Sequence, residues 1–176
     1  MQVPHTNSRS PKAAKALVAI VALVMAASVA MLSGCAPSQP AATEDKPVTA
    51  AGYMNSMAKS SKQLSESFSD FSGAVAEGDV SALQAKVDSA NEVLDQMESL
   101  EAPDELKSVK GKYDEAIGTL KDALNDYLAI FLEIENAPEG AQYDFSDYGQ
   151  RLESVQKAYD QGLNLLEEAD KMATEM

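Results

Sequence analysis

The sequence has little of the chemistry on which most enzymes depend. Its 176 residues include one histidine, His5, one cysteine, Cys35, and no tryptophan. From residue 36 onward there is neither histidine nor cysteine, so no Cys–His or Ser–His–Asp catalytic arrangement can be built there. The same scarcity excludes a zinc site with nitrogen or sulfur ligands, a haem attachment site and an internal disulfide. We therefore expect a protein that is not an enzyme and that holds no cofactor or metal.

Basic residues are also scarce. The chain has 14 Lys and Arg residues against 28 Asp and Glu residues, a formal net charge of −14. Three of the basic residues, Arg9, Lys12 and Lys15, lie before residue 35, and no acidic residue does. The chain from residue 35 onward therefore has 11 basic and 28 acidic residues, a net charge of −17. A domain with this charge repels nucleic acid and anionic membrane surfaces, so we expect no nucleic-acid partner.

The first 35 residues have the order of a secretory signal. A basic start is followed by an almost wholly apolar run at residues 16–32, and small residues then lead into the only cysteine. An uncleaved transmembrane helix is the alternative. It is weaker because 17 residues are close to the lower limit for spanning, where about 20 are usual, and because no cluster of positive charge follows the run.

The four residues Leu32, Ser33, Gly34 and Cys35 resemble the lipobox of bacterial lipoproteins. In that family the cysteine sulfur receives a diacylglyceryl group, the preceding peptide is removed, and the cysteine becomes the mature N-terminus. The resemblance implies that residues 1–34 are a removed signal peptide. It also implies that lipid on Cys35 anchors the protein to the bacterial cell membrane, on the extracytoplasmic face. It covers only these 35 residues and gives no activity to the rest.

Residues 35–49 are expected to form a flexible linker that carries the lipid. Residues 36–49 contain three prolines and many small polar residues without apolar periodicity. A flexible coil of this length spans about 20 Å, and an extended polyproline-like segment about 40 Å. Such a linker would hold the following domain clear of the lipid headgroups.

Residues 50–176 are predicted to form a domain of four amphipathic helices. In residues 54–75, 80–97, 106–134 and 148–173 apolar residues recur at alternating steps of three and four, and no segment has the period of two that marks a strand. Gly78 and Asp79 are expected to end the first helix and cap the second, while Pro103 suits the start of the third. Short connections favour antiparallel neighbours. We therefore predict an all-α, antiparallel four-helix bundle. Long hairpins paired between two chains, a coiled-coil homodimer, are the alternative.

The element Leu-Glu-Ala-Pro-Asp-Glu-Leu at residues 100–106, a helix end followed by a proline-started helix, is similar to small helical domains of many bacterial surface lipoproteins. This resemblance implies no activity. The histidines of iron-binding helical lipoproteins are missing, as is the Cys-x-x-Cys-His of a bundle cytochrome.

The densest apolar stretch of the domain is a candidate site. Around residues 127–134, apolar residues occur on all sides of the predicted helix; the candidate patch consists of Tyr127, Leu128, Ile130, Phe131 and Ile134. One interpretation is an exposed patch for a partner or a hydrophobic ligand. The other, which we favour, is a buried helix end covered by Tyr143, Phe145 and Tyr148, because a helix that is apolar all round is usually buried.

Acidic residues and glycines supply weaker candidates. Glu139, Asp144 and Asp147 offer oxygen ligands, but they lack the spacing of a calcium loop and are better explained as helix caps. Asp122 and Asp126 lie one helical turn apart, whereas Glu167 and Glu168 point in different directions; a solvated acidic face explains both pairs better than acid–base chemistry does. Gly111, Gly118 and Gly162 fall inside predicted helices, where glycine indicates either close helix packing or a gap for a small ligand.

Two functions remain open. We expect foremost a lipid-anchored accessory or scaffold protein of the cell envelope, which binds another envelope protein through an acidic helical face. The alternative is an extracytoplasmic binding protein that holds a small hydrophobic or cationic ligand in the bundle core. The alternative requires a cavity near Gly118, Gly162 and residues 127–134, whereas a scaffold requires an exposed patch above a filled core.

Overall fold

The protein folds into an all-α bundle, as the sequence predicts. The computed structural model describes residues 49–137 and 146–175. Four α-helices, α2 (Ala50–Glu77), α3 (Val80–Glu98), α4 (Lys107–Glu135) and α5 (Tyr148–Thr174), make up this part, and the 3-10 turn η2 (Asp104–Leu106) precedes α4. Within these two ranges there is no β-strand. The predicted signal peptide and linker, up to residue 48, lie outside the described residues, as do Glu139 and Asp144.

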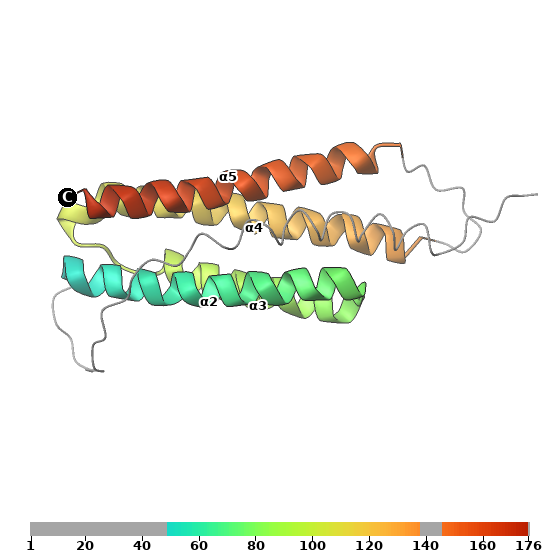
Figure 1. Cartoon of the computed structure of the whole chain (residues 1–176), viewed down its shortest axis with the longest axis horizontal. Coiled ribbons are helices and arrows are strands. Elements are labelled where there is room, and N and C mark those ends of the chain that lie inside the picture. The colour runs from blue at the N-terminus through green and yellow to red at the C-terminus, as the bar shows by residue number, and fades with distance from the viewer. Residues whose placement is uncertain (1–48, 138–145, 176) are drawn as a thin grey trace, which may run out of the picture.

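Neighbouring helices run antiparallel and form two hairpins. Helix α2 packs against α3, and α4 packs against α5 (Figure 1). The start of α2 and the last turn of α5 lie at one end of the bundle, whereas the end of α4 and the first turn of α5 lie at the other (Figure 1). We call these the entry end and the far end. No helix in the described ranges combines the length and the apolar character that a bilayer-crossing segment needs.

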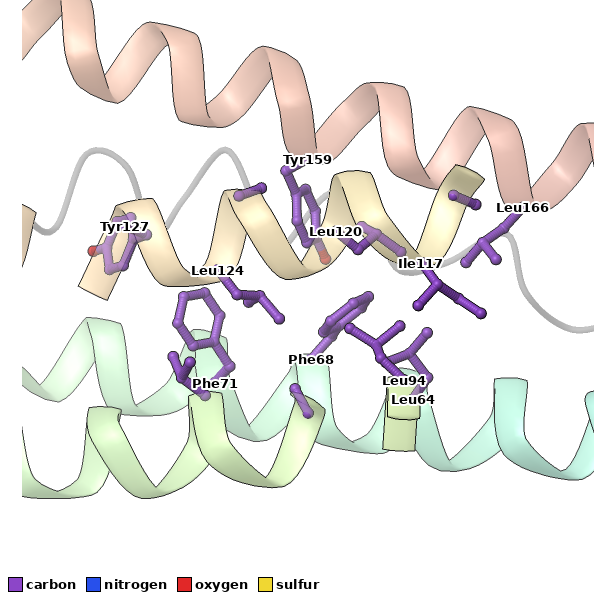
Figure 2. Close-up of a cluster of buried hydrophobic side chains, with 14 of the residues drawn as sticks. Leu64, Phe68, Phe71, Leu94, Ile117, Leu120, Leu124, Tyr127, Tyr159 and Leu166 are labelled. Atoms are coloured by element: carbon purple, nitrogen blue, oxygen red, sulfur yellow. The ribbon is translucent and has the colours of Figure 1, made fainter. Parts of the chain in front are cut away.

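Aromatic side chains join the two hairpins at the centre of the bundle. The ring of Phe68 on α2 meets that of Tyr159 on α5 edge-on, with centroids 5.3 Å apart, and Phe71 meets Tyr127 on α4 in the same way at 5.4 Å. Figure 2 shows these rings between the hairpins, beside leucines such as Leu94 and Leu124. Edge-to-face pairs add about 0.5–1.5 kcal/mol each beyond the area they bury. The interface between the hairpins therefore depends on a few large side chains.

The apolar stripes are the ones expected, with one shift at the start of α2. The pattern of alternating three- and four-residue steps that starts at residue 54 predicts that Met54 and Ser61 lie on the inner face. Instead, Tyr53 and Ser60 are the buried residues there, and Met54 and Ser61 are only half-buried. Adjacent positions differ by about 100° around a helix, so two neighbours can compete for the edge of one face. The larger ring of Tyr53 takes the inner position, and the stripe is as predicted from Leu64 onward.

The turn between α2 and α3 confirms the predicted caps. Gly78 has a left-handed backbone, φ 67°, and its N–H donates to the carbonyl of Ala74 at 3.0 Å. The Asp79 carboxylate accepts from the N–H of Ala82 at 3.1 Å. Thr49, which the sequence assigned to the linker, caps α2 in the same way by accepting from Gly52 N–H at 3.1 Å. Pro103 starts the turn η2 rather than the α-helix itself.

Candidate functional site

The predicted lipidation site lies outside the described residues. This holds for Cys35 and for the neighbouring Leu32, Ser33 and Gly34. The described helix that follows them in sequence is α2, which begins at Ala50 at the entry end (Figure 1).

The apolar segment of α4 is buried. Tyr127, Leu128, Ile130 and Phe131 are each at most 8% exposed, and Ile134 is half-buried against the same core. The interpretation as an exposed patch is therefore wrong for the first four residues. The physical reason is that α4 is enclosed here by its neighbours, with the Phe71 ring of α2 against Tyr127 and with the buried Tyr148 at the start of α5.

The gap that a core ligand would need near Gly162 is filled. A Cβ atom at Gly162 would lie 2.5 Å from Cγ of Leu120 and 3.3 Å from the Leu120 backbone nitrogen. Gly162 thus lies where α4 and α5 approach closely. Of the two interpretations of the glycines, close helix packing is therefore the correct one for Gly162. Gly118 is exposed, with no atom within 4 Å of such a Cβ. The alternative function requires a cavity near Gly118, Gly162 and residues 127–134, and the space beside Gly162 is filled by Leu120.

A groove lies instead between α4 and α5, toward the far end. It has a volume of about 450 Å³, and its walls are formed by residues of both helices: Asp126, Ala129, Ile130, Asp147, Gln150, Arg151, Ser154 and Val155. Ile130 and Val155 are buried, whereas the two aspartates, Gln150 and Ser154 are exposed. The groove therefore has an apolar base and a polar rim. We call it the α4–α5 groove.

The one basic residue of the groove lining is already paired. Arg151 donates through both terminal nitrogens to the two carboxylate oxygens of Glu133, at 2.6 and 2.9 Å. The Tyr148 hydroxyl donates to the same carboxylate at 3.0 Å, and the guanidinium lies 5.2 Å from the centre of the Tyr148 ring. The hydrogen bonds from Arg151, followed by that from Tyr148, lower the pKa of Glu133. The charge of Glu133 balances that of Arg151. The net charge at the rim is therefore determined by Asp126 and Asp147.

The polar groups of the entry end form a different arrangement. Tyr53 and Tyr113 are almost fully buried there, and the Tyr113 hydroxyl donates to the Asp170 carboxylate of α5. Burial raises the pKa of Asp170, and the Tyr113 hydrogen bond opposes part of that rise. Burial, together with the nearby Asp114, raises the pKa of Tyr53 to about 12. The Tyr113–Asp170 hydrogen bond joins α4 to α5.

The acidic pairs considered from the sequence remain solvated. Asp122 and Asp126 are both exposed on α4, and only Asp126 lines the groove. Glu167 and Glu168 are exposed on α5, and a Glu168 oxygen lies 3.6 Å from Lys112. Asp147 stands at the start of α5 but makes no capping hydrogen bond. In the two described ranges no group of three or more His, Cys, Asp or Glu side chains could hold a metal ion.

Sequence reasoning missed the α4–α5 groove and the Tyr113–Asp170 pair. Each joins residues of two different helices, and the relative rotation of the two helices brings them together. One sequence feature could have indicated the groove. Asp126 and the small residue Ala129 lie about one turn apart on the outer face of a helix whose inner face is apolar. Comparison of the chain with family models, curated proteins and solved structures finds no match.

Proposed function

We propose that this chain is a non-enzymatic, lipid-anchored protein of the bacterial cell envelope that serves as a protein-interaction module. The lipid on Cys35 would hold it at the extracytoplasmic face, and the acidic bundle would contact another envelope protein. The chain from residue 35 onward has a net charge of −17, so attachment through lipid is more plausible than attraction to an anionic bilayer.

The observation that carries the interaction function is the contrast between a filled core and a hollowed acidic surface. Leu120 occupies the space beside Gly162, whereas the α4–α5 groove is open and bordered by Asp126 and Asp147. A module that binds through its surface needs this arrangement. The alternative, a binding protein for a small ligand in the bundle core, finds less support because Leu120 fills the space beside Gly162 and Gly118 lies on the surface.

The anchor is tested by lipid labelling of wild type and Cys35→Ser in the native host. We expect the wild type to incorporate labelled fatty acid and to sediment with membranes. The Cys35→Ser variant should keep its leader and remain unlabelled. Equal processing and labelling of the two proteins would contradict the anchor.

The interaction is tested by cross-linking the anchored protein in its own envelope and identifying the adducts by mass spectrometry. We expect an adduct with a defined envelope protein, and that protein, once purified, should bind the purified lipoprotein. Adducts that contain only second copies of this chain would favour the homodimer instead. Purified candidates that all fail to bind would contradict the interaction function.

A further inference from the structure

We propose that the α4–α5 groove seats a lysine or arginine side chain from a basic segment of the partner protein. This inference rests on the proposed interaction function and adds to it the site and the chemistry of the partner. It commits to one occupant, a cationic side chain inserted between α4 and α5.

The charge of the rim favours a cation. Asp126 on α4 and Asp147 on α5 are exposed and border the groove from opposite helices. The only basic group in the lining, Arg151, forms the bidentate pair with Glu133, and the charge of Asp147 also acts on it. An incoming ammonium or guanidinium therefore meets two carboxylates and no uncompensated positive charge, in a chain whose net charge is already −14. Complementary charge of this kind determines partner choice and the rate of association.

The shape of the groove favours a long side chain. Its base contains Ile130 and Val155, and Ala129 leaves room in the α4 wall. Lysine and arginine lay their methylene stems on apolar surface while their charged heads stay among polar groups. A volume of about 450 Å³ lies within the usual range of roughly 300–1,000 Å³ for binding pockets. One such side chain fits within it.

The position of the groove suits contact with a partner. Helix α2 has 28 residues and is therefore about 42 Å long, and it begins at the entry end. Residues near the end of α4 and the start of α5 line the groove. Figure 1 shows that these parts of the two helices lie toward the far end. If Cys35 is anchored as proposed, the groove lies toward the end of the domain opposite to the one at which α2 begins.

The test measures binding of a labelled peptide to the full processed protein in detergent micelles. The probe is a fluorescein-labelled dodecapeptide of alternating alanine and arginine, and its control has citrulline, which is uncharged and of nearly the same shape, in place of arginine. We expect fluorescence anisotropy to show binding of the arginine peptide only. Asp126→Asn and Asp147→Asn should each weaken that binding about two- to fivefold, as for the loss of a surface ion pair.

Matched variants separate the groove from general attraction. Asp122→Asn removes the same charge one turn from Asp126 but outside the groove, and it should weaken binding less than Asp126→Asn does, because Asp122 forms no ion pair with a side chain seated in the groove. Ala129→Arg places a guanidinium in the groove itself and should weaken binding about tenfold or more. Its control is Gln161→Arg, which adds the same charge at an exposed position outside the groove. All five variants alter exposed residues, and thermal unfolding of each checks the fold.

The outcomes distinguish this inference from the proposed function. Equal weakening by Asp122→Asn and Asp126→Asn would overturn the groove as the site, while the interaction function would stand. Equal binding of the arginine and citrulline peptides, or no binding of either, would overturn the cationic occupant. A dimer in sedimentation that Ala129→Arg dissociates would show that a second copy occupies the groove, which also overturns the inference. Failure of the cross-linking experiment in the envelope would count against the interaction function itself.

Discussion

The two ends of the bundle use similar residue types in opposite ways. At the entry end, Tyr113 and Asp170 meet among buried side chains, and Asp170 is removed in part from water. At the far end, the buried Tyr148 and the half-buried Arg151 donate hydrogen bonds to the exposed carboxylate of Glu133, beside the open α4–α5 groove. A tyrosine donates to a carboxylate at each end. Both bonds join α4 to α5 and both tyrosines are buried, but the accepting carboxylates differ: Asp170 is half-buried, whereas Glu133 is exposed and also pairs with Arg151.

This difference predicts which end of the bundle is more sensitive to mutation. A buried polar pair is costly to break, because the partner left behind keeps its desolvation penalty. An exposed pair contributes little, since water replaces either partner. The entry end should therefore tolerate few changes, whereas the charged groups of the far end can vary at small cost to folding.

The largest expected effect comes from the core on which both ends depend. Leu124 is 1% exposed at the centre of the bundle (Figure 2), so Leu124→Asp buries a charge that has no partner. We expect a loss of about 4 kcal/mol or more, enough to unfold the domain at both ends together. Circular dichroism during thermal unfolding measures this. The matched control is Asn125→Asp, which introduces the same side chain at the adjacent exposed position and should melt close to wild type.

A smaller effect is expected where α4 and α5 approach most closely. Gly162→Ala would place a Cβ 2.5 Å from Cγ of Leu120, so the two helices must separate or Leu120 must move. We expect a loss of about 1–2 kcal/mol, as for other overpacked cores. Gly118→Ala is its control, because that exposed position has space for the methyl group and should gain about 0.5–1 kcal/mol. Denaturant unfolding measures both.

The Gly162 interpretation would be contradicted if both glycine variants stabilised the protein. It is sharpened by a double variant: in a Leu120→Ala background the cost of Gly162→Ala should shrink, because the colliding side chain is gone. An undiminished cost would place the strain in the backbone rather than in Leu120.

The glycines also show which features could be predicted from the sequence. Gly111, Gly118 and Gly162 look alike in an amphipathic pattern, and only the seam position of Gly162 suggested a packing role. Helix bounds, the all-α fold and the Gly78–Asp79 turn depend on local chemistry, so the sequence predicted them well. The burial of Tyr127, Leu128, Ile130 and Phe131 followed from apolar residues on all sides of the helix.

The remaining features depend on how two helices are rotated against each other. Asp126 and Asp147 are 21 positions apart, and Tyr113 and Asp170 are 57 positions apart. No local pattern relates the members of either pair. The rotation of helices against each other also explains the one-residue error in the predicted apolar face at the start of α2. There, contact with other helices rather than sequence spacing determines that Tyr53 is the inner residue.

The next prediction compares the two tyrosine–carboxylate bonds directly. Tyr113→Phe deletes the hydroxyl that donates to Asp170 and leaves that partly buried carboxylate without this donor, so we expect a loss of about 1–2 kcal/mol. Tyr148→Phe makes the same change at the far end, where Arg151 still pairs with the exposed Glu133, and should cost less than about 0.5 kcal/mol. Denaturant unfolding of the pair measures the difference. Equal losses would show that burial does not separate the two ends.

The smallest expected effect is a difference in how the two ends respond to pH. Burial raises the folded pKa of Asp170, so the folded state binds the carboxyl proton more tightly than the unfolded state does. The contribution of Asp170 to stability is therefore present below its ordinary pKa. It is lost as pH rises through the folded pKa. The folded pKa of Glu133 is lowered by Arg151 and Tyr148, so its contribution to stability is present above its ordinary pKa and is lost as pH falls through the folded value.

Carboxyl carbon NMR titration should therefore place the midpoint of Asp170 above, and that of Glu133 below, the ordinary value of each residue type. Tyr113→Phe should raise the Asp170 midpoint further, because the opposing hydrogen bond is removed, while the Glu133 midpoint stays in place. If the Asp170 midpoint instead moved down in that variant, the hydroxyl could not be stabilising the charged carboxylate.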